Sequence, residues 1–396
     1  MKVIQINAVY KTMSTGKICY SVSELLNSEG VENLTLYSHG KNGYKNTQKI
    51  GNNLYYKIQA LKSRIFGNFG FNSHIATKKM LKVIDDFKPD IVQLHNLHAH
   101  NVNLSMLFNY FKTHKEIKIF WTFHDCWEFT SYCPHFTIAK CDKWKMGCYK
   151  CPQRKGVSWF FDRSQQVFRK KEQALSGQNM TIITPSHWLA ELVKQSFLKD
   201  YPVKVINNGI DLTIFKPTES NFRKKYNIPE GTKILLAVSA GWSERKGFDV
   251  IIELAKRLDV AKYRFVVVGT DNKTEKALPE GVISIHRTNN QTELAEIYTS
   301  ADVFVNPTRE ENYPTVNMEA IACGTPVITF RTGGSPEILT DKTGIVVDCD
   351  DVDAMQKGIE DICEKNLFNA SELLERAKSF DANARFRDYI KLYRED

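Results

Sequence analysis

The chain has 396 residues, which exceeds one ordinary hydrophobic core and suits two domains of about 150–200 residues each. Hydrophobic residues make up 42% and charged residues 25% of the chain, a globular composition that excludes a disordered protein. Lys and Arg outnumber Asp and Glu by 54 to 45, and the net charge of +9 suits nucleotide diphosphates, lipid phosphates or nucleic acid without choosing among them.

The first residues, Met1–Asn7, show a short strand pattern that turns polar at once and contain no apolar run long enough for a signal peptide. No stretch of about 18 apolar residues occurs elsewhere in the sequence. We therefore expect a cytoplasmic protein, whose attachment to a membrane would be peripheral and at the inner face. Its nine cysteines are expected to be thiols, because the cytoplasm keeps them reduced.

Short β-branched runs alternate with longer amphipathic segments along the whole chain. In the first half, strands are predicted at Val3–Asn7, Leu34–Ser38, Ile91–His95, Ile117–Phe123, Thr181–Thr184 and Val203–Asn207. Helical patterns between them cover Lys17–Glu29, Ala76–Phe87 and Trp188–Phe197. In the second half, strands are predicted at Ile234–Ser239, Arg264–Gly269, Val282–Ile285, Val303–Asn306 and Val327–Phe330. This alternation predicts an α/β protein with two doubly wound, Rossmann-like domains, each built on a parallel sheet.

The best boundary between the two domains is the turn-rich stretch Asn207–Asp211. We therefore predict an N-terminal domain over residues 1–207, a C-terminal domain over residues 208–380 and a final helix within residues 381–396. That helix, at about Ala382–Tyr393, is amphipathic and is expected to pack on the N-terminal domain. Doubly wound sheets bind ligands beyond the carboxyl ends of their strands, so the loops after strands are the expected place for chemistry.

An acidic loop and a helix start follow the fourth predicted strand of the second half. In this segment, R-E-E-N-Y-P-T-V-N-M-E-A, Pro314 suits the first position of a helix. The amides of Thr315 and Val316 would then form a phosphate site at the helix start. Glu311 precedes that start and Glu319 lies more than one turn inside, so two carboxylates flank the site at positions suited to sugar and ribose hydroxyls. The alternative is a solvated acidic loop with one structural glutamate.

The spacing of Glu311 and Glu319, with the G-G-S-P-E sequence at 333–337, resembles the E-x7-E signature of the family-four retaining glycosyltransferases of the GT-B fold. Upstream, Asn208–Asp211 is similar to that family's interdomain motif, and Glu244–Gly247 is similar to its diphosphate-binding turn. The resemblance covers essentially the entire chain. It implies two Rossmann-like domains that face each other across a cleft and a sugar transfer that retains anomeric configuration.

The resemblance places the donor site mainly in the C-terminal domain. Glu319 would bind the nucleotide ribose, and Glu311 would act in catalysis by binding hydroxyls of the donor sugar. Arg245 and Lys246 would hold the diphosphate, whose charge grows as it leaves. The other donor-binding residues implied by the resemblance are Gly16, Asn312, Tyr313, Pro314, Thr315 and Val316.

At two positions of this donor site the sequence either allows a second interpretation or departs from the family pattern. Gly16, in S-T-G-K, matches the family's N-terminal glycine loop, where a glycine permits close backbone approach to phosphates, but a plain helix-starting turn explains it equally well. The family usually carries an Arg six residues before the diphosphate lysine, and this chain has Ala240 there. Lys246 and Arg245 would then carry more of the phosphate charge.

The resemblance also implies acceptor-side residues in the N-terminal domain. His124, at the end of a predicted strand, matches the family's catalytic histidine that faces the transferred sugar, and Asp125 would orient its ring. A core histidine is the alternative. His95, Asn96 and His98 follow another predicted strand and are expected to line the acceptor cleft, with a histidine metal site as the less favoured interpretation.

The expected partners follow from the same resemblance. They are a UDP- or GDP-linked sugar donor and a glycan or lipid-linked acceptor, because the Cys126–Cys151 region resembles transferases that build bacterial capsular and other exopolysaccharides. No D-x-D motif stands at a strand end near the donor motifs, so no cofactor is expected to be required for catalysis. An anionic membrane surface would suit the basic residues of the N-terminal domain, which are Lys57, Lys62, Arg64, Lys78, Lys79 and Lys82. A solvated charged face explains them at least as well.

Two alternative functions remain at this point. A nucleotide-sugar epimerase of the same fold would consume the donor without an acceptor and release no free nucleotide. A cysteine-rich nucleic-acid-binding protein fits the basic balance, but the sequence shows no basic-aromatic repeat or known reader module, so no nucleic-acid partner is expected.

The loop at 126–151 contains five of the nine cysteines. Cys133, Cys141, Cys148 and Cys151 follow the pattern Cys-x7-Cys-x6-Cys-x2-Cys, and a long loop in a compact domain needs something to hold it. Four thiolates around a structural zinc would do so. The alternative is four ordinary thiols in a loop ordered by aromatic side chains, and an iron–sulfur cluster is less favoured than either.

Overall fold

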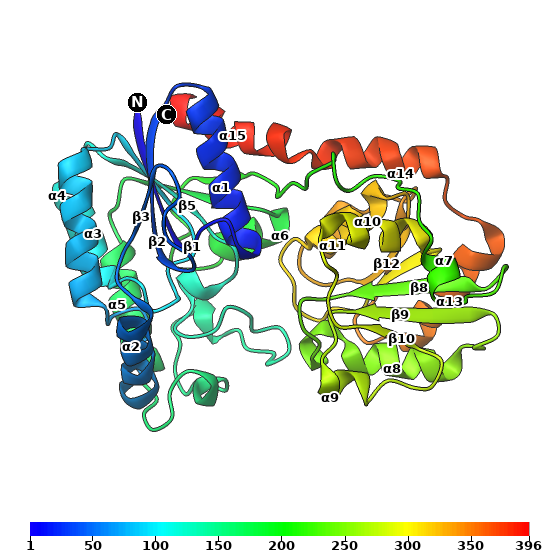
Figure 1. The fold of residues 1–396 in the computed structure, drawn as a ribbon. Coiled ribbons are helices and arrows are strands. Elements are labelled where there is room, and N and C mark those ends of the chain that lie inside the picture. The colour runs from blue at the N-terminus through cyan, green and yellow to red at the C-terminus, as the bar shows by residue number, and fades with distance from the viewer. Residues whose placement is uncertain (396) are drawn as a thin grey trace. The chain divides into compact units, whose positions relative to one another are not determined.

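The β-branched runs of the sequence form the strands of two separate parallel sheets. The computed structural model describes residues 1–395 and divides into two units. The first unit comprises Met1–Asn207 together with the C-terminal residues from Phe386 on, and the second comprises Asn208–Arg385. Figure 1 shows helices on both sides of each sheet. Sheets covered on both faces explain why the strands read as near-continuous apolar runs.

The first unit is built on a seven-stranded sheet of order β3-β2-β1-β4-β5-β6-β7, in which every neighbouring pair is parallel. Its strands are β1 (Lys2–Val9), β2 (Glu32–His39), β3 (Thr47–Lys49), β4 (Ile91–Leu94), β5 (Lys118–Thr122), β6 (Met180–Thr184) and β7 (Val203–Val205). Its helices are α1 (Met13–Ser28), α2 (Asn53–Phe66), α3 (His74–Phe87), α4 (Leu104–Thr113), α5 (Ser164–Leu175) and α6 (His187–Lys194).

The second unit is built on a six-stranded parallel sheet of order β10-β9-β8-β11-β12-β13. Its strands are β8 (Lys233–Val238), β9 (Tyr263–Val268), β10 (Ile283–Ile285), β11 (Val303–Asn306), β12 (Val327–Phe330) and β13 (Gly344–Val347). Its helices are α7 (Phe222–Lys225), α8 (Phe248–Arg257), α9 (Asn272–Glu275), α10 (Gln291–Ser300), α11 (Thr315–Ala322), α12 (Ser335–Ile338), α13 (Val352–Lys365) and α14 (Ala370–Ala377).

The last helix, α15 (Ala382–Glu395), belongs to the first unit from Phe386 onward. Its Tyr393 hydroxyl donates to Gln93 Oε1 on β4 at 2.9 Å, and Tyr389 accepts from the Thr122 hydroxyl at the end of β5 at 3.2 Å. Both tyrosines are buried. The apolar stripe seen in the sequence is therefore the face that α15 packs on the first sheet.

None of the helices within residues 1–395 has both the length and the apolar character required to cross a membrane.

Candidate active site

The acidic loop after β11 leads into the start of α11, as the sequence predicts. The helix begins at Thr315, one residue later than expected, and Pro314 occupies the position before it with φ −72° and ψ 114°. Because proline lacks an amide hydrogen, its place at a helix start leaves no donor unsatisfied. The amides of Thr315 and Val316 thus stand at the first turn, where backbone donors and the helix dipole favour an anion.

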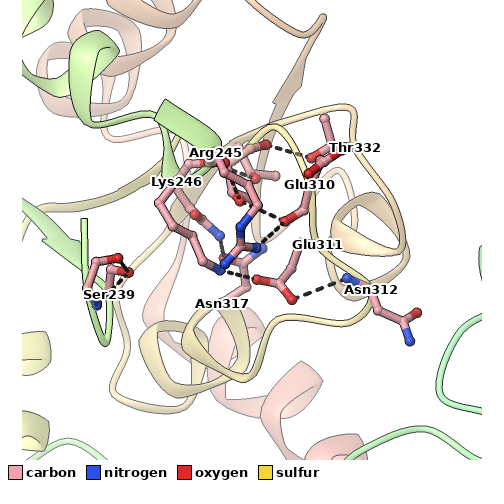
Figure 2. A network of polar contacts seen from close by, with 12 residues as sticks. Ser239, Arg245, Lys246, Glu310, Glu311, Asn312, Asn317 and Thr332 are labelled. Carbon is pink, nitrogen blue, oxygen red and sulfur yellow. Dashed lines mark hydrogen bonds and ion pairs between the residues drawn. The ribbon is translucent and has the colours of Figure 1, made fainter. Parts of the chain in front are cut away.

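Lys246 and Glu311 meet beside this helix start, and Figure 2 shows their side chains pointing toward each other. Lys246 ends a short turn after β8, whereas Glu311 comes from the loop after β11. The Lys246 ammonium forms an ion pair with Glu311 Oε2, and each side chain is 23% exposed. The strands β8 and β11 are neighbours in the sheet, so their following loops converge at its carboxyl edge.

Two glycines allow these loops to approach each other. Gly247 has φ 71°, and a Cβ atom there would lie 2.0 Å from the Pro307 carbonyl oxygen. Gly333 has φ 53°, and a Cβ atom there would lie 1.6 Å from the Glu311 carbonyl oxygen. Both contacts are too short for any other residue, so the glycines hold the turn of Lys246 and the loop of Glu311 in place.

The other predicted diphosphate ligand, Arg245, has a different environment. Its guanidinium Nη1 donates to the Glu310 carbonyl at 3.1 Å, and its own carbonyl accepts from the Arg309 amide at 2.9 Å. Arg245 therefore links the loop after β8 to the loop after β11 by hydrogen bonds. Arg309 pairs with Asp249 and Asp350. Ala240 is exposed and supplies no cation.

Among the remaining predicted donor residues, Asn312 and Tyr313 are buried, whereas Glu319 is half-buried. Asn312 is 4% exposed and Tyr313 is 6% exposed, and Tyr313 packs in the hydrophobic core of the second unit. Burial raises the pKa of Tyr313 to about 12, so its hydroxyl stays neutral. Glu319 is half-buried, and its Oε2 accepts from the Tyr298 hydroxyl at 3.1 Å. Sequence reasoning missed Tyr298, because its contact with Glu319 depends on the packing of α10 against α11.

Gly16 lies in a helix-starting turn, which is the alternative to the glycine loop implied by the resemblance. The helix α1 begins at Met13, so Gly16 is in its first turn, and its carbonyl accepts from the Lys11 amide at 2.9 Å. A Cβ atom at Gly16 would meet Val9 Cγ2 at 3.1 Å. The glycine thus fits close packing against the end of β1, and its contact with the donor stays a prediction.

His95 and His124, at the ends of β4 and β5, stack on each other in the first unit. Their ring centroids are 5.6 Å apart, and His95 Nδ1 lies 3.3 Å from His124 Nε2. His95 Nε2 lies 3.2 Å from Gln5 Oε1, while Gln5 Nε2 donates to the Cys19 carbonyl at 3.1 Å. Gln5 was missed in the sequence, although a polar side chain in the middle of an apolar strand was the available signal.

This chain of contacts determines which ring nitrogens carry protons. The Cys19 carbonyl orients the Gln5 amide, so Gln5 Oε1 accepts from His95 Nε2–H. His95 Nδ1 then accepts from His124 Nε2–H, and the lone pair of neutral His124 lies on Nδ1. Burial lowers the pKa of His124 to about 4, against the opposing effect of Asp125, and burial also lowers the pKa of His95. Both rings are therefore neutral near pH 7.

Asp125 pairs with His98 rather than orienting His124, and this corrects the sequence prediction. Asp125 Oδ2 lies 2.9 Å from His98 Nε2, and its Oδ1 accepts from the Trp127 amide at 2.8 Å. Burial alone would raise the pKa of Asp125, but His98 and the Trp127 amide outweigh it and lower that pKa to about 2. Asn96 Oδ1 accepts from the His98 amide at 3.1 Å. The predicted acceptor-side residues thus lie together after β4 and β5.

The four cysteines of the predicted zinc site line one small cavity of about 10 Å³. Within residues 1–395, however, no three His, Cys, Asp or Glu side chains are arranged as a metal ion requires. Burial raises the pKa of Cys133 to about 12 and of Cys151 to about 11. All four thiols are free of disulfide bonds, and the structural zinc at Cys133, Cys141, Cys148 and Cys151 stays a prediction.

Aromatic packing and a buried lysine that the sequence did not reveal also hold this loop. Trp144 packs against Phe129 and Phe136 at ring distances of 5.1 and 5.0 Å. Lys171 on α5 is fully buried, and its ammonium donates to the carbonyls of Trp127 and Thr130. Burial lowers the pKa of Lys171 to about 7 in spite of the nearby Glu128, which is also buried.

We expect Lys171→Met to destabilise the first unit by about 3 kcal/mol, because the buried carbonyls of Trp127 and Thr130 lose their hydrogen-bond donor. In urea unfolding followed by tryptophan fluorescence, the midpoint should fall by about 1 M. Five of the six tryptophans lie in residues 1–207, so this signal reports mainly the first unit. The neighbouring exposed Lys170→Met is the matched control. Equal midpoints for the two variants would contradict the role given to Lys171.

Residues 17–214 match the family described as Glycosyltransferase Family 4, and residues 218–387 match Glycosyl transferases group 1. The putative colanic acid biosynthesis glycosyl transferase WcaC of Escherichia coli (strain K12) is 23% identical over 380 residues, which cover 89% of this chain and 88% of WcaC.

Two solved structures resemble the whole chain. Sucrose-phosphate synthase from Thermosynechococcus elongatus has a TM-score of 0.73 and 15% identity, with 100% of this chain and 98% of its own chain covered. Anabaena Alr3699/HepE in complex with UDP-glucose has a TM-score of 0.71 and 13% identity, with 100% of both chains covered. These likenesses confirm the predicted fold class, two parallel-sheet α/β domains of the GT-B type. With one family matching half of its residues, the chain belongs to Glycosyltransferase Family 4 and is a glycosyltransferase.

Proposed function

We infer that this enzyme transfers a sugar from a nucleotide-sugar donor, with retention of configuration, to a glycan or lipid-linked glycan during bacterial surface polysaccharide synthesis. The observation that carries this proposal is the Lys246–Glu311 ion pair beside the first turn of α11. A cation and backbone amides suit a diphosphate, whereas a carboxylate suits sugar hydroxyls, and the two are adjacent here. The relative WcaC supports the polysaccharide assignment, and Alr3699/HepE, which binds UDP-glucose, supports a UDP-linked donor.

The proposed reaction exchanges one bond for another at the anomeric carbon. The bond from this carbon to the diphosphate oxygen breaks, and a bond to the acceptor oxygen forms on the same face of the sugar. The acceptor hydroxyl gives its proton to the departing diphosphate. Lys246 and the amides of Thr315 and Val316 would stabilise the charge that develops on that leaving group.

Each carboxylate has a separate proposed role. Glu311 would exchange its ion pair with Lys246 for hydroxyls of the donor sugar when the diphosphate draws the lysine away. Glu319 would accept from the ribose, with its carboxylate oriented by the buried Tyr298 hydroxyl. On the first unit, neutral His124 would contact the transferred sugar through Nδ1, and the His98–Asp125 pair would bind acceptor hydroxyls.

A thermal-shift experiment tests the donor directly. UDP, GDP, ADP and the corresponding glucose and mannose nucleotides are added to the purified chain, and the binding nucleotide should raise the melting temperature by several degrees at about 100 times its Kd. Glu319→Ala should lose this shift, because the ribose loses its acceptor. Glu372→Ala on α14, whose side chain is 40% exposed, is the control. If no nucleotide shifts the wild type, the donor assignment is wrong.

Product analysis separates sugar transfer from the epimerase alternative. Incubation of the binding nucleotide sugar with lipid extracts should release free nucleotide diphosphate and glycosylate a lipid-linked acceptor. An isomer of the donor that forms without acceptor and without free nucleotide would instead support an epimerase.

A further inference from the structure

The helix α2 is oriented with its apolar stripe toward solvent. Leu54, Ile58 and Leu61 are 69%, 44% and 49% exposed, and their spacing of four and three residues places them on one face. The opposite face contains Tyr56, Gln59 and Ser63, which are buried. This arrangement differs from the usual pattern of a surface helix, in which the aliphatic side chains pack on the core.

The buried polar face of α2 explains why the helix cannot simply be rotated. Gln59 Oε1 accepts from the Ser73 amide at 3.3 Å. The Ser63 hydroxyl lies 3.2 Å from His100 Nδ1 and accepts from the Asn72 side chain at 2.8 Å. These hydrogen bonds fix the helix in the orientation that exposes the leucines and the isoleucine.

Three consecutive exposed aromatic residues adjoin the end of α2. Trp159, Phe160 and Phe161 are 52%, 64% and 50% exposed. The Trp159 amide donates to the Arg64 carbonyl at 2.7 Å, and a Cβ atom on Gly67 would lie 3.1 Å from the Phe161 carbonyl oxygen. The aromatic residues and the stripe of α2 therefore belong to one surface.

The part of the chain that contains α2 is rich in positive charge. Between Glu32 and Asp85 the sequence contains no acidic residue, but it contains Lys41, Lys45, Lys49, Lys57, Lys62, Arg64, Lys78, Lys79 and Lys82. By helical spacing, Lys57 and Arg64 border one side of the exposed stripe and Lys62 borders the other. The Arg64 guanidinium lies 6.0 Å from the centre of the Trp159 ring, and Lys155 lies four residues before Trp159.

We propose that α2 and residues 159–161 form a docking surface for an anionic membrane. Basic side chains would contact lipid phosphates, while the aliphatic stripe and the aromatic side chains would enter the boundary between headgroups and acyl chains. Charge complementarity favours anionic lipid over a second copy of this chain, since a symmetric contact would bring like charges together. The inference rests on the proposed function only in that a lipid-linked acceptor would be located at a membrane.

Vesicle sedimentation with the full chain tests this surface. Vesicles of phosphatidylcholine mixed with phosphatidylglycerol should sediment the protein, whereas pure phosphatidylcholine should bind it at least about tenfold more weakly. Binding should also weaken in about 1 M salt, where charges are screened over about 3 Å. Equal sedimentation with both vesicles, or none with either, would overturn the proposal.

Variants locate the binding within the surface. We expect the triple variant Trp159→Ser, Phe160→Ser, Phe161→Ser and the separate triple variant Lys57→Gln, Lys62→Gln, Arg64→Gln each to weaken binding at least about tenfold. Leu54→Ser with Leu61→Ser tests α2 independently if the first variant does not fold. Leu367→Ser, at an apolar residue that is 48% exposed on the second unit, is the control and should bind like the wild type.

Two further readouts distinguish a failure of this surface from a failure of the proposed function. The thermal shift caused by the nucleotide depends on the second unit and should therefore be present in every surface variant. If the wild-type protein shows no such shift with any nucleotide, the donor assignment alone is contradicted. Trp159 fluorescence should shift to shorter wavelength with anionic vesicles, and the Trp159→Phe protein should lose that change. Surface variants that bind vesicles as strongly as the wild type would show that the protein docks elsewhere or not at all.

Discussion

Replacing Glu311 by Gln or Lys246 by Ala is expected to lower the rate of sugar transfer at least about tenfold, which corresponds to about 1.4 kcal/mol of barrier. Glu311→Gln keeps the size of the side chain but removes the charge that binds sugar hydroxyls strongly. Lys246→Ala removes a cation beside the helix start of α11, where the leaving diphosphate gains charge. The measurement is the initial rate on the donor that gives the largest thermal shift, with protein whose melting curve matches the wild type.

A matched ion pair on the same unit provides the control. Lys342 and Glu372 lie 2.8 Å apart and are 64% and 40% exposed, and Lys342→Ala or Glu372→Gln should leave the rate unchanged. The double variant at Lys246 and Glu311 should lose less than the product of the two single losses, because residues in contact do not act additively. Wild-type rates in both single variants would remove these two residues from the donor site.

The central strands of the fold could be predicted because their sequences carry their own signal. Val303–Asn306 and Val327–Phe330 are short apolar runs between turn residues, and the structure forms β11 and β12 with these same limits. The strands β3 (Thr47–Lys49) and β13 (Gly344–Val347) were missed, and both lie at the edges of their sheets. An edge strand is paired on one side only, so its sequence needs less of the continuous apolar pattern of a central strand.

The candidate site shows the same division between local and distant information. The segment from Glu311 to Glu319 could be interpreted from sequence because a loop, a proline and a helix start follow one another directly. The pairing of Asp125 with His98 could not, because it joins residues 27 positions apart through the adjacency of β4 and β5. The burial of Lys171 could not be predicted either, since its position in the sequence resembles that of an ordinary charged residue on a helix surface.

The buried histidines of the first unit are expected to make it unstable in mild acid. Burial lowers the pKa of His124 to about 4, and burial, together with the nearby Arg64, lowers the pKa of His100 to about 4. In the unfolded chain these rings have the ordinary pKa of about 6.5. Between about pH 4 and 6.5 the unfolded state therefore binds more protons than the folded state, and stability falls as the pH falls.

The expected loss at about pH 5 is roughly 2 kcal/mol for each of the two rings relative to neutral pH. Urea unfolding between about pH 7 and 5, followed by tryptophan fluorescence, measures it, and Asp125 adds nothing in this range because its lowered pKa of about 2 leaves it ionised in both states. The buried His95 adds to the fall, whereas the raised pKa of buried Glu128 opposes it. His124→Gln and His100→Gln should each reduce the fall by about 2 kcal/mol relative to the wild type, whereas His286→Gln, exposed on the second unit, should not change it. A midpoint that stays constant over this range in the wild type would mean that the folded first unit accepts protons on these rings, and the neutral histidine relay from Gln5 to His124 would then be wrong.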